Sequence, residues 1–276
     1  MSAVAQTSPA PDRSQAGETP RGHEGPLHGP GGAAQHSAVG GQLSPEMLRV
    51  TDLHAFYGES HILHGIDLTV NEGELVTLLG RNGSGRSTTL KAIMGIVGRR
   101  TGSVMLDGSE ITALAPHTIV RLGVGYCPEE RGIFSGLTTE ENLMLPPVVR
   151  SGGMTLDEIY TVFPNLYERR ASPGMRLSGG EQQMLAMARI LRTGARLLLL
   201  DEITEGLAPV IVKKLGEVIR LLKTRGYTIV LVEQNFRFAA PLADRHYVLE
   251  HGRIVATVNK NELASSTEML HELLGV

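Results

Sequence analysis

The sequence predicts an α/β fold with a mixed or largely parallel core sheet. Two apolar runs, at 75–79 and 197–201, have the continuous hydrophobic character of strands that are buried on both faces. The first run leads into a glycine-rich loop and then into residues 86–96, whose apolar side chains recur at helical spacing. The second run ends in two carboxylates, Asp201 and Glu202, at the carboxyl end of the expected parallel strand. These patterns indicate a strand–loop–helix unit beside a strand that carries acidic groups.

Periodicity and turn residues predict the other elements. We expect strands near 48–57, 63–70, 74–79, 102–107, 123–127, 196–201, 227–232, 245–250 and 253–258, and helices that include 86–96, 179–192 and 209–225. Residues 138–176 are mostly helical in pattern, with interruptions by Pro and Gly. Residues 1–45 contain 8 Gly and 6 Pro but only four residues drawn from Leu, Ile, Val and Phe, too few to offset the entropy of ordering. The sequence therefore predicts a disordered tail at 1–45 and one domain at 46–276.

The loop LLGRNGSGRSTTL, residues 78–90, matches a phosphate-binding loop with one substitution. The Walker A pattern requires Gly, four residues, Gly, Lys and then Ser or Thr. Gly80, Gly85 and Ser87 fit, whereas Arg86 stands where Lys is expected. Glycines in such a turn let backbone N–H groups and a helix N-terminus approach phosphate, and the Ser87 hydroxyl is then placed to bind Mg²⁺. A glycine-rich turn that binds nothing is the alternative.

The heptapeptide LSGGEQQ at 177–183 is the most specific motif in the chain. Ser178 and Glu181 have the spacing of a capping box, and the segment that follows is rich in strong helix formers with an apolar stripe. A helix should therefore begin at the serine and present free N–H groups to an anion. A simple helix cap is the alternative.

The order of these segments resembles that of the ATP-binding subunits of ABC transporters, from about residue 47 to the C-terminus. FYG at 56–58, PEER at 128–131, EGLAP at 205–209 and VEQN at 232–235 resemble in particular the second, LivF-type, ATP-binding subunit of branched-chain amino-acid importers. This resemblance implies a P-loop NTPase fold of the ABC ATPase type. It further implies an N-terminal antiparallel β subdomain and an inserted helical subdomain at about 138–180.

The resemblance also implies a role for individual residues. Asp201 would hold Mg²⁺ and Glu202 would act as the general base, although an acidic pair also occurs where helices start. Glu129 stands at the position of the Q-loop glutamine, and Gln234 stands at the position of the switch histidine. Tyr57 would stack on adenine, with a buried strand tyrosine as the alternative. The implied residues are Tyr57, Gly80, Arg81, Asn82, Gly83, Ser84, Gly85, Arg86, Ser87 and Thr88 for ATP; Ser87, Glu129 and Asp201 for the metal; Glu202 and Gln234 for catalysis; and Leu177, Ser178, Gly179, Gly180 and Glu181 for ATP bound by the partner.

The implied activity is hydrolysis of ATP with Mg²⁺ to power uptake of branched-chain amino acids or related polar solutes. The implied partners are a second ATP-binding subunit, in a heterodimer or a homodimer, two transmembrane permease subunits and, indirectly, a periplasmic solute-binding protein. No run of eighteen apolar residues occurs, so attachment to the cytoplasmic face of the inner membrane would come through the permeases. The net charge of −3, with both signs interspersed, predicts no nucleic-acid partner.

Two other functions remain open on the sequence. A degenerate, regulatory nucleotide-binding subunit of a similar transporter is favoured by Arg86, Glu129 and Gln234. A soluble, non-transport ABC ATPase would share the motifs, but such proteins usually carry long coiled-coil insertions or two cassettes, and the sequence has neither. The motifs do not encode the solute, because a binding protein and a permease choose it.

Overall fold

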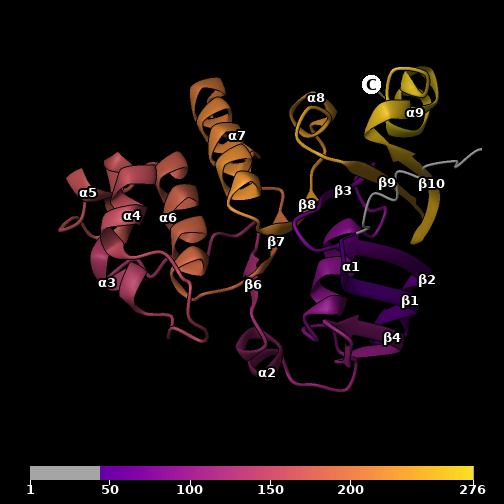
Figure 1. Ribbon diagram of the computed structural model, residues 1–276, viewed down its shortest axis with the longest axis horizontal. Coiled ribbons are helices and arrows are strands. Elements are labelled where there is room, and N and C mark those ends of the chain that lie inside the picture. Colours follow the sequence, from indigo (N-terminus) through magenta and orange to yellow (C-terminus); the bar gives the residue numbers. More distant parts are fainter. Residues whose placement is uncertain (1–43, 276) are drawn as a thin grey trace, which may run out of the picture. The chain divides into compact units, whose positions relative to one another are not determined.

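The computed structural model describes residues 44–275, so the tail predicted for residues 1–45 lies outside the described part except for its last two residues. Within this part the strands form two sheets (Figure 1). The smaller sheet has the order β2-β1-β4-β5 and is antiparallel, and the larger sheet has the order β10-β9-β3-β8-β7-β6. The bounds are β1 Glu46–Tyr57, β2 Ser60–Asn71, β3 Leu75–Gly80, β4 Arg99–Leu106, β5 Ser109–Glu110, β6 Val124–Cys127, β7 Leu197–Asp201, β8 Thr228–Val232, β9 Arg245–Glu250 and β10 Arg253–Asn259.

The larger sheet is parallel except for its edge strand β10, which pairs antiparallel with β9. Strands β3, β7 and β8 are buried along their whole length, as expected for central strands covered on both faces. On β7, Leu197 and Leu199 pack into one hydrophobic cluster, whereas Leu198 and Leu200 pack into another. This alternation, with a period of two, confirms the predicted α/β fold with a mixed, mainly parallel core sheet.

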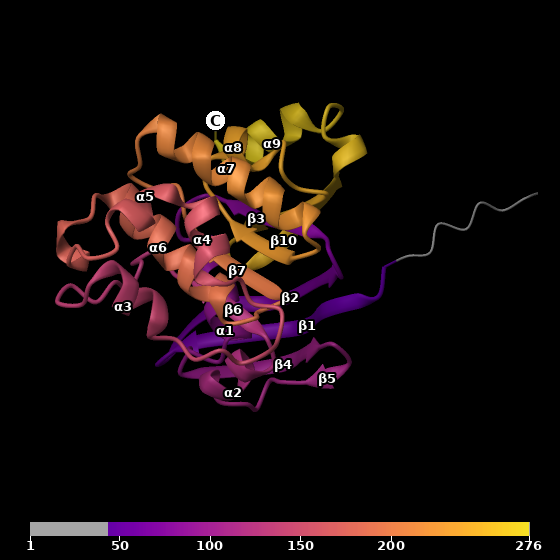
Figure 2. The same cartoon turned by 60° about the vertical axis from the view of Figure 1, so that its left-hand side comes forward.

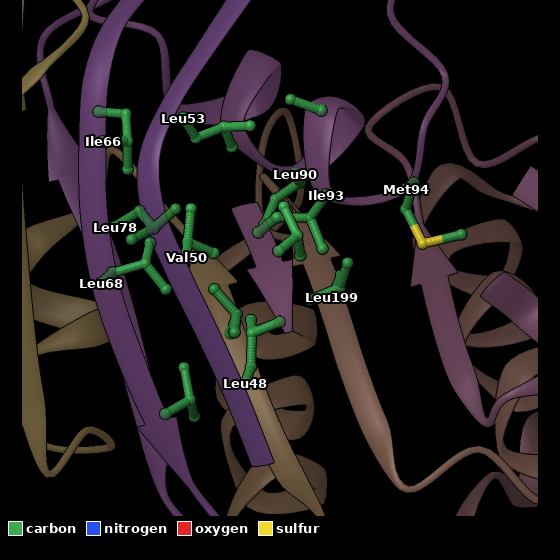
Figure 3. Close-up of a cluster of buried hydrophobic side chains, with 14 of the residues drawn as sticks. Leu48, Val50, Leu53, Ile66, Leu68, Leu78, Leu90, Ile93, Met94 and Leu199 are labelled. Atoms are coloured by element: carbon green, nitrogen blue, oxygen red, sulfur yellow. The ribbon is translucent and has the colours of Figure 1, made fainter. Parts of the chain in front are cut away.

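Helix α1 (Arg86–Ile93) packs against both sheets and so fixes the loop that precedes it. Leu48 of β1, Leu68 of β2, Leu90 of α1 and Leu199 of β7 belong to one buried cluster (Figure 3). Complete burial of a leucine side chain contributes about 1.5–3 kcal/mol. The first residue of α1, and with it the end of the glycine-rich loop, is therefore held by packing on two sides.

Helices α6 (Gly179–Arg192) and α7 (Pro209–Thr224) contribute to the second hydrophobic cluster, where Leu185 and Leu215 pack with Leu198 of β7. Figures 1 and 2 show three short helices beside α6, in the segment between β6 and α6. Their bounds are α3 Thr139–Met144, α4 Leu156–Val162 and α5 Pro164–Glu168, followed by a 3₁₀ turn at Gly174–Arg176. The remaining helices are α2 Pro116–Arg121, α8 Phe236–Ala239 and α9 Thr267–Leu274, with a 3₁₀ turn at Lys260–Glu262. None of the helices within 44–275 has the length and apolar composition that a membrane crossing requires.

Several element ends differ from the expected ones by one to three residues, and two of these differences have clear physical reasons. Helix α1 ends at Ile93 instead of residue 96, because Gly95 adopts a left-handed φ of 71° that terminates the helix. Strand β4 begins at Arg99 instead of residue 102, because its pairing with β1 extends to Phe56. The helix expected at 179–192 has the predicted bounds.

Candidate nucleotide-binding site

The glycine-rich loop makes a tight turn between β3 and α1. A Cβ atom at Gly80 would overlap the Leu249 carbonyl oxygen, and one at Gly85 would lie 2.8 Å from a methyl carbon of Leu63. Gly85 also has a φ of 106°, and no side chain caps the N-terminus of α1. The first N–H groups of the helix therefore remain available at the positive end of its dipole, which is a geometry that binds phosphate.

A cavity of about 400 Å³ opens at this loop, within the size range of small-molecule sites. Its lining consists of Tyr57, Ile62, Asn82, Gly83, Ser84, Gly85, Arg86, Ser87, Thr88, Glu129, Glu202 and Glu205. Of the residues expected to bind ATP, all but Gly80 and Arg81 line it. Gly80 ends β3, and the Arg81 side chain instead donates hydrogen bonds to the carbonyl oxygens of Glu272 (2.8 Å) and Leu273 (3.1 Å) in α9.

Tyr57 lies at the end of β1 and at the edge of this cavity. It is 46% exposed, which excludes the buried-strand alternative. Its ring is available for stacking on a planar ligand, an interaction worth roughly 1–3 kcal/mol when a nucleic-acid base stacks on a protein aromatic. Ile62, which the sequence analysis did not single out, lines the same cavity with an apolar side chain.

Ser87 and Asp201 form the oxygen-rich end of the site. The Ser87 hydroxyl donates to Asp201 Oδ1 at 2.7 Å, and the Tyr126 hydroxyl donates to Asp201 Oδ2 at 3.0 Å. Burial raises the pKa of the Asp201 carboxyl, while these two hydrogen bonds lower it. A hydroxyl and a carboxylate so placed are the hard oxygen donors that Mg²⁺ prefers, so these residues fit that ion. The sequence analysis missed Tyr126 because only folding brings β6 beside β7.

Arg86 and Glu202 form a buried ion pair across the site. Arg86 Nη2 donates to Glu202 Oε1 at 2.7 Å, and the two side chains are 3% and 13% exposed. Burial raises the pKa of the Glu202 carboxyl to about 7, and the charge of Arg86 opposes this rise. Glu202 also adopts a left-handed φ of 47°, a conformation costly for a residue with a side chain and often found at functional sites.

The Glu202 carboxylate of this ion pair lies close to two other carboxylates. One oxygen each from Glu129, Glu202 and Glu205 lies within 4.8 Å of the other two. Burial raises the pKa of Glu129, and the nearby carboxylate of Glu205 raises it further. Of the three, Glu205 was not expected. Its position three residues after Glu202, in the turn that follows β7, is a signal that could have identified it.

The segment that follows β8, which carries Gln234 at the position of the switch histidine, lies next to Glu202. A second cavity of about 270 Å³ is lined by Glu202, Thr204, Glu205, Glu233, Gln234 and Asn235. The buried Glu233 carboxylate accepts hydrogen bonds from Thr204 N (3.2 Å) and Thr204 Oγ1 (2.8 Å), and burial raises its pKa to about 7. Glu233 follows an apolar strand just as Asp201 and Glu202 do, so the same pattern could have identified it.

The LSGGEQQ segment folds locally as predicted. The Ser178 backbone N–H donates to Glu181 Oε2 at 2.7 Å, and the Glu181 backbone N–H donates to Ser178 Oγ at 3.3 Å, so a capping box starts α6. An added Cβ at Gly180 would lie 2.9 Å from Ile211, so the glycine permits close packing of α6 on α7. Ser178 is exposed, and the set Leu177, Ser178, Gly179, Gly180 and Glu181 does not contribute to the described lining of the phosphate-loop cavity.

A phosphate loop between a buried parallel strand and a helix, facing a carboxylate at the end of a neighbouring parallel strand, defines a P-loop nucleotide-binding protein. A family model described as ABC transporter matches residues 63–205. The chain belongs to the ABC transporter family, and it is an ATP-hydrolysing subunit of that family. The predicted resemblance is thus confirmed.

Relatives in sequence and in structure agree with this family. The chain is 42% identical over 212 residues (76% of this chain, 91% of the relative) to the high-affinity branched-chain amino acid transport ATP-binding protein BraG of Pseudomonas aeruginosa. It is 39% identical over 238 residues (83% and 99%) to a probable branched-chain amino acid transport ATP-binding protein LivF of Archaeoglobus fulgidus. It is also 32% identical over 235 residues (83% and 97%) to the lipopolysaccharide export system ATP-binding protein LptB of Haemophilus influenzae.

Solved structures support the fold. An ATP-binding subunit of an ABC transporter superposes with a TM-score of 0.70 at 27% identity, covering 83% of this chain and 100% of that one. An ATP-binding cassette solved as a dimer in a post-hydrolysis state, bound to ADP and Pi, superposes with a TM-score of 0.69 at 25% identity, covering 78% of this chain and 99% of that one.

Proposed function

We propose that this chain powers an importer of branched-chain amino acids or related polar solutes by hydrolysing ATP. The observation that carries the proposal is the cavity lined by the phosphate loop, Ser87 and Glu202, in which Ser87 is hydrogen-bonded to the buried Asp201. The higher identity to the BraG and LivF relatives than to the LptB relative favours import over export. The solute is inferred from those relatives alone.

In this proposal each part of the cavity takes a separate part of ATP. Tyr57 stacks on the adenine, and the loop from Asn82 to Thr88 holds the phosphates with backbone N–H groups. Mg²⁺ would be held by Ser87, Asp201 and Glu129, where it would neutralise developing charge on the phosphates. Glu202, which follows β7, accepts a proton from the attacking water, and Gln234, which lines a neighbouring cavity together with Glu202, orients the reacting groups.

Helix α6, which begins within the LSGGEQQ segment, contacts a nucleotide other than the one in this chain's own cavity. Ser178 is exposed, and it starts a helix whose first N–H groups, those of Gly179 and Gly180, can donate to an anion outside the chain's own phosphate cavity. We infer that they contact ATP held by a second ATP-binding subunit, so that two chains, different or identical, complete two sites. This arrangement agrees with the dimeric form of one structural neighbour.

The membrane partners would dock on the segment between β6 and α6, at about 138–180. Six apolar side chains in and next to this segment are exposed: Phe134, Met144, Leu145, Val148, Tyr167 and Met175. Exposed apolar surface that forms a contiguous patch commonly marks a protein interface. Two permease subunits seated here would attach the chain to the cytoplasmic face of the inner membrane and link it to a periplasmic solute-binding protein.

Reconstitution tests this function. The chain, a second ATP-binding subunit, two permeases and a solute-binding protein would be assembled in liposomes, and ATP hydrolysis and solute uptake would be measured together. We expect leucine, isoleucine or valine to stimulate both. Hydrolysis without stimulation by any amino acid or related polar solute, or stimulation only by a lipid cargo, would contradict the import proposal.

A regulatory role is a second candidate, because Glu202 is paired with Arg86 instead of being free in the cavity. In that case the chain would turn ATP over slowly and would act mainly by binding it beside a faster partner. Inactivating the partner's catalytic carboxylate separates the two roles. Substantial remaining ATP turnover by the complex supports a main catalytic role for this chain, and turnover reduced to a small residue supports the regulatory one.

A further inference from the structure

The Arg86 guanidinium connects three loops at the carboxyl ends of neighbouring strands. Nη2 donates to Glu202 Oε1 at 2.7 Å and to Asn82 Oδ1 at 3.1 Å, and Nη1 donates to the Glu233 carbonyl oxygen at 3.1 Å. Asn82 follows β3, Glu202 follows β7 and Glu233 follows β8. One side chain thus bridges the phosphate loop, the proposed general base and the residue before Gln234.

Both charges of the ion pair are withdrawn from water. The Arg86 side chain is 3% exposed and the Glu202 side chain is 13% exposed. A buried charge is costly unless a partner of opposite charge and hydrogen bonds satisfy it. The guanidinium therefore requires an anion at this position, and in the structure that anion is Glu202.

The same guanidinium also lines the cavity proposed for the phosphates of ATP. A planar guanidinium presents a fork of donors that fits carboxylate and phosphate oxygens equally well, whereas an ammonium is a compact point charge. Glu202 and the terminal phosphate of ATP are therefore competitors for one fork. The Glu202 backbone N–H is bonded to the Val232 carbonyl oxygen at 3.0 Å, so exchange of partners requires movement of the side chain alone.

We propose that Arg86 is a positioning residue for Glu202: it holds the carboxylate until the terminal phosphate of ATP takes its place on the guanidinium. This inference rests on the proposed ATP site and adds a function for the residue that replaces the usual lysine. Binding of ATP and release of the general base become one event. ATP binding is consequently weakened by the ion pair that it breaks.

A double-mutant cycle on ATP binding tests the exchange. Binding of a non-hydrolysable ATP analogue with Mg²⁺ to the full-length chain would be measured by isothermal titration calorimetry at one fixed pH. We expect Glu202→Gln to tighten binding about tenfold when Arg86 is present, which corresponds to about 1.4 kcal/mol of binding free energy. In the Arg86→Lys background the same substitution should tighten binding less than about threefold, because the fork is absent.

Glu205→Gln is the matched control. It removes a carboxylate that lines the same cavity but is not among the hydrogen-bond partners of Arg86. We expect its effect on binding to be smaller than that of Glu202→Gln and equal in both backgrounds. The comparison of the two glutamine variants in the wild-type background tests the exchange even if Arg86→Lys does not fold. If cavity carboxylates simply repel ATP, both variants should tighten ATP binding equally.

Two results would overturn the exchange: equal tightening by Glu202→Gln in both backgrounds, or equal tightening by Glu202→Gln and Glu205→Gln in the wild-type background. Either would mean that the tightening comes from removing a carboxylate from the cavity and not from breaking the ion pair. Failure of the wild-type chain and of every variant to bind the analogue would instead contradict the proposed ATP site itself.

Discussion

Arg86 distinguishes this phosphate loop from the Walker A pattern, and in the structure its side chain forms an ion pair with Glu202. Its guanidinium is planar, longer than a lysine ammonium and always charged. It reaches Glu202, a residue 116 positions away, while the glycine backbone of the loop and the Ser87–Asp201 pair keep the geometry that binds phosphate and Mg²⁺. Nucleotide binding should therefore be retained with arginine in place of the Walker A lysine. The geometry at the terminal phosphate should differ from that of a site with lysine.

Arg86→Lys should leave ATP affinity within a few-fold and raise ATP turnover at this site. A compact ammonium fits within the loop and no longer holds Glu202, and small changes in position at the reacting phosphate have large effects on rate. Turnover would be measured in the assembled complex after inactivation of the partner's site. A lower turnover in the variant would show that the surrounding loop is adapted to arginine.

His246 gives a prediction about stability and pH. Its Nδ1 shares a hydrogen bond of 2.6 Å with Thr77 Oγ1, and its buried Nε2 has no hydrogen-bond partner among the described residues. Burial lowers the pKa of His246 to about 4 in the folded chain, against roughly 6.5 when unfolded. Below about pH 6.5 the unfolded state therefore binds the proton more strongly, and folding stability is lost as pH falls toward 4.

The loss from His246 should amount to about 3 kcal/mol over this range. Urea unfolding at a series of pH values would measure it. His246→Leu should flatten the dependence, while the exposed His117→Leu should leave it unchanged. An identical pH dependence in the wild type and in His246→Leu would show that this histidine is not responsible.

Among the elements, helix α6, which begins within the LSGGEQQ segment, has one residue with both a structural and a proposed functional role: Ser178. The capping box of Ser178 and Glu181 fixes the start of the helix, and the exposed serine does not line the chain's own cavity. Ser178→Arg should therefore impair turnover at the partner's nucleotide while leaving ATP affinity of the isolated chain nearly unchanged. A tenfold weaker affinity of the isolated variant for ATP would show that the motif contacts the nucleotide bound by its own chain.

The sequence predicted elements well where local chemistry determines them. The helix from Gly179 to Arg192 had the expected bounds because Ser178 supplies its cap, and the buried strand ending at Asp201 was evident from its leucines. The start of β4 was wrong by three residues because pairing with β1, a long-range contact, extends the strand. The hydrogen bond from the Arg81 side chain to the end of α9 likewise depends on a residue almost two hundred positions away.

At the scale of the whole molecule, the sheet edge brings together residues that are far apart in the sequence. The phosphate loop, Asp201 and Glu202, and the switch segment follow neighbouring strands β3, β7 and β8, so their convergence was predictable from the strand pattern. The Arg86–Glu202 pair, the Tyr126 hydroxyl and the carboxylate of Glu205 were not, because side-chain contacts depend on the packed geometry and motif spacing does not encode them.

The most direct test of the account is ATP turnover by the assembled transporter that carries Glu202→Gln in this chain, with the partner's site inactivated in both the variant and its reference. The account predicts that turnover falls by roughly 10²–10⁴, the usual contribution of a general base, while ATP binding is retained and the two ATP-binding subunits remain associated around the nucleotide. Undiminished steady-state hydrolysis by the variant would contradict the catalytic role of Glu202.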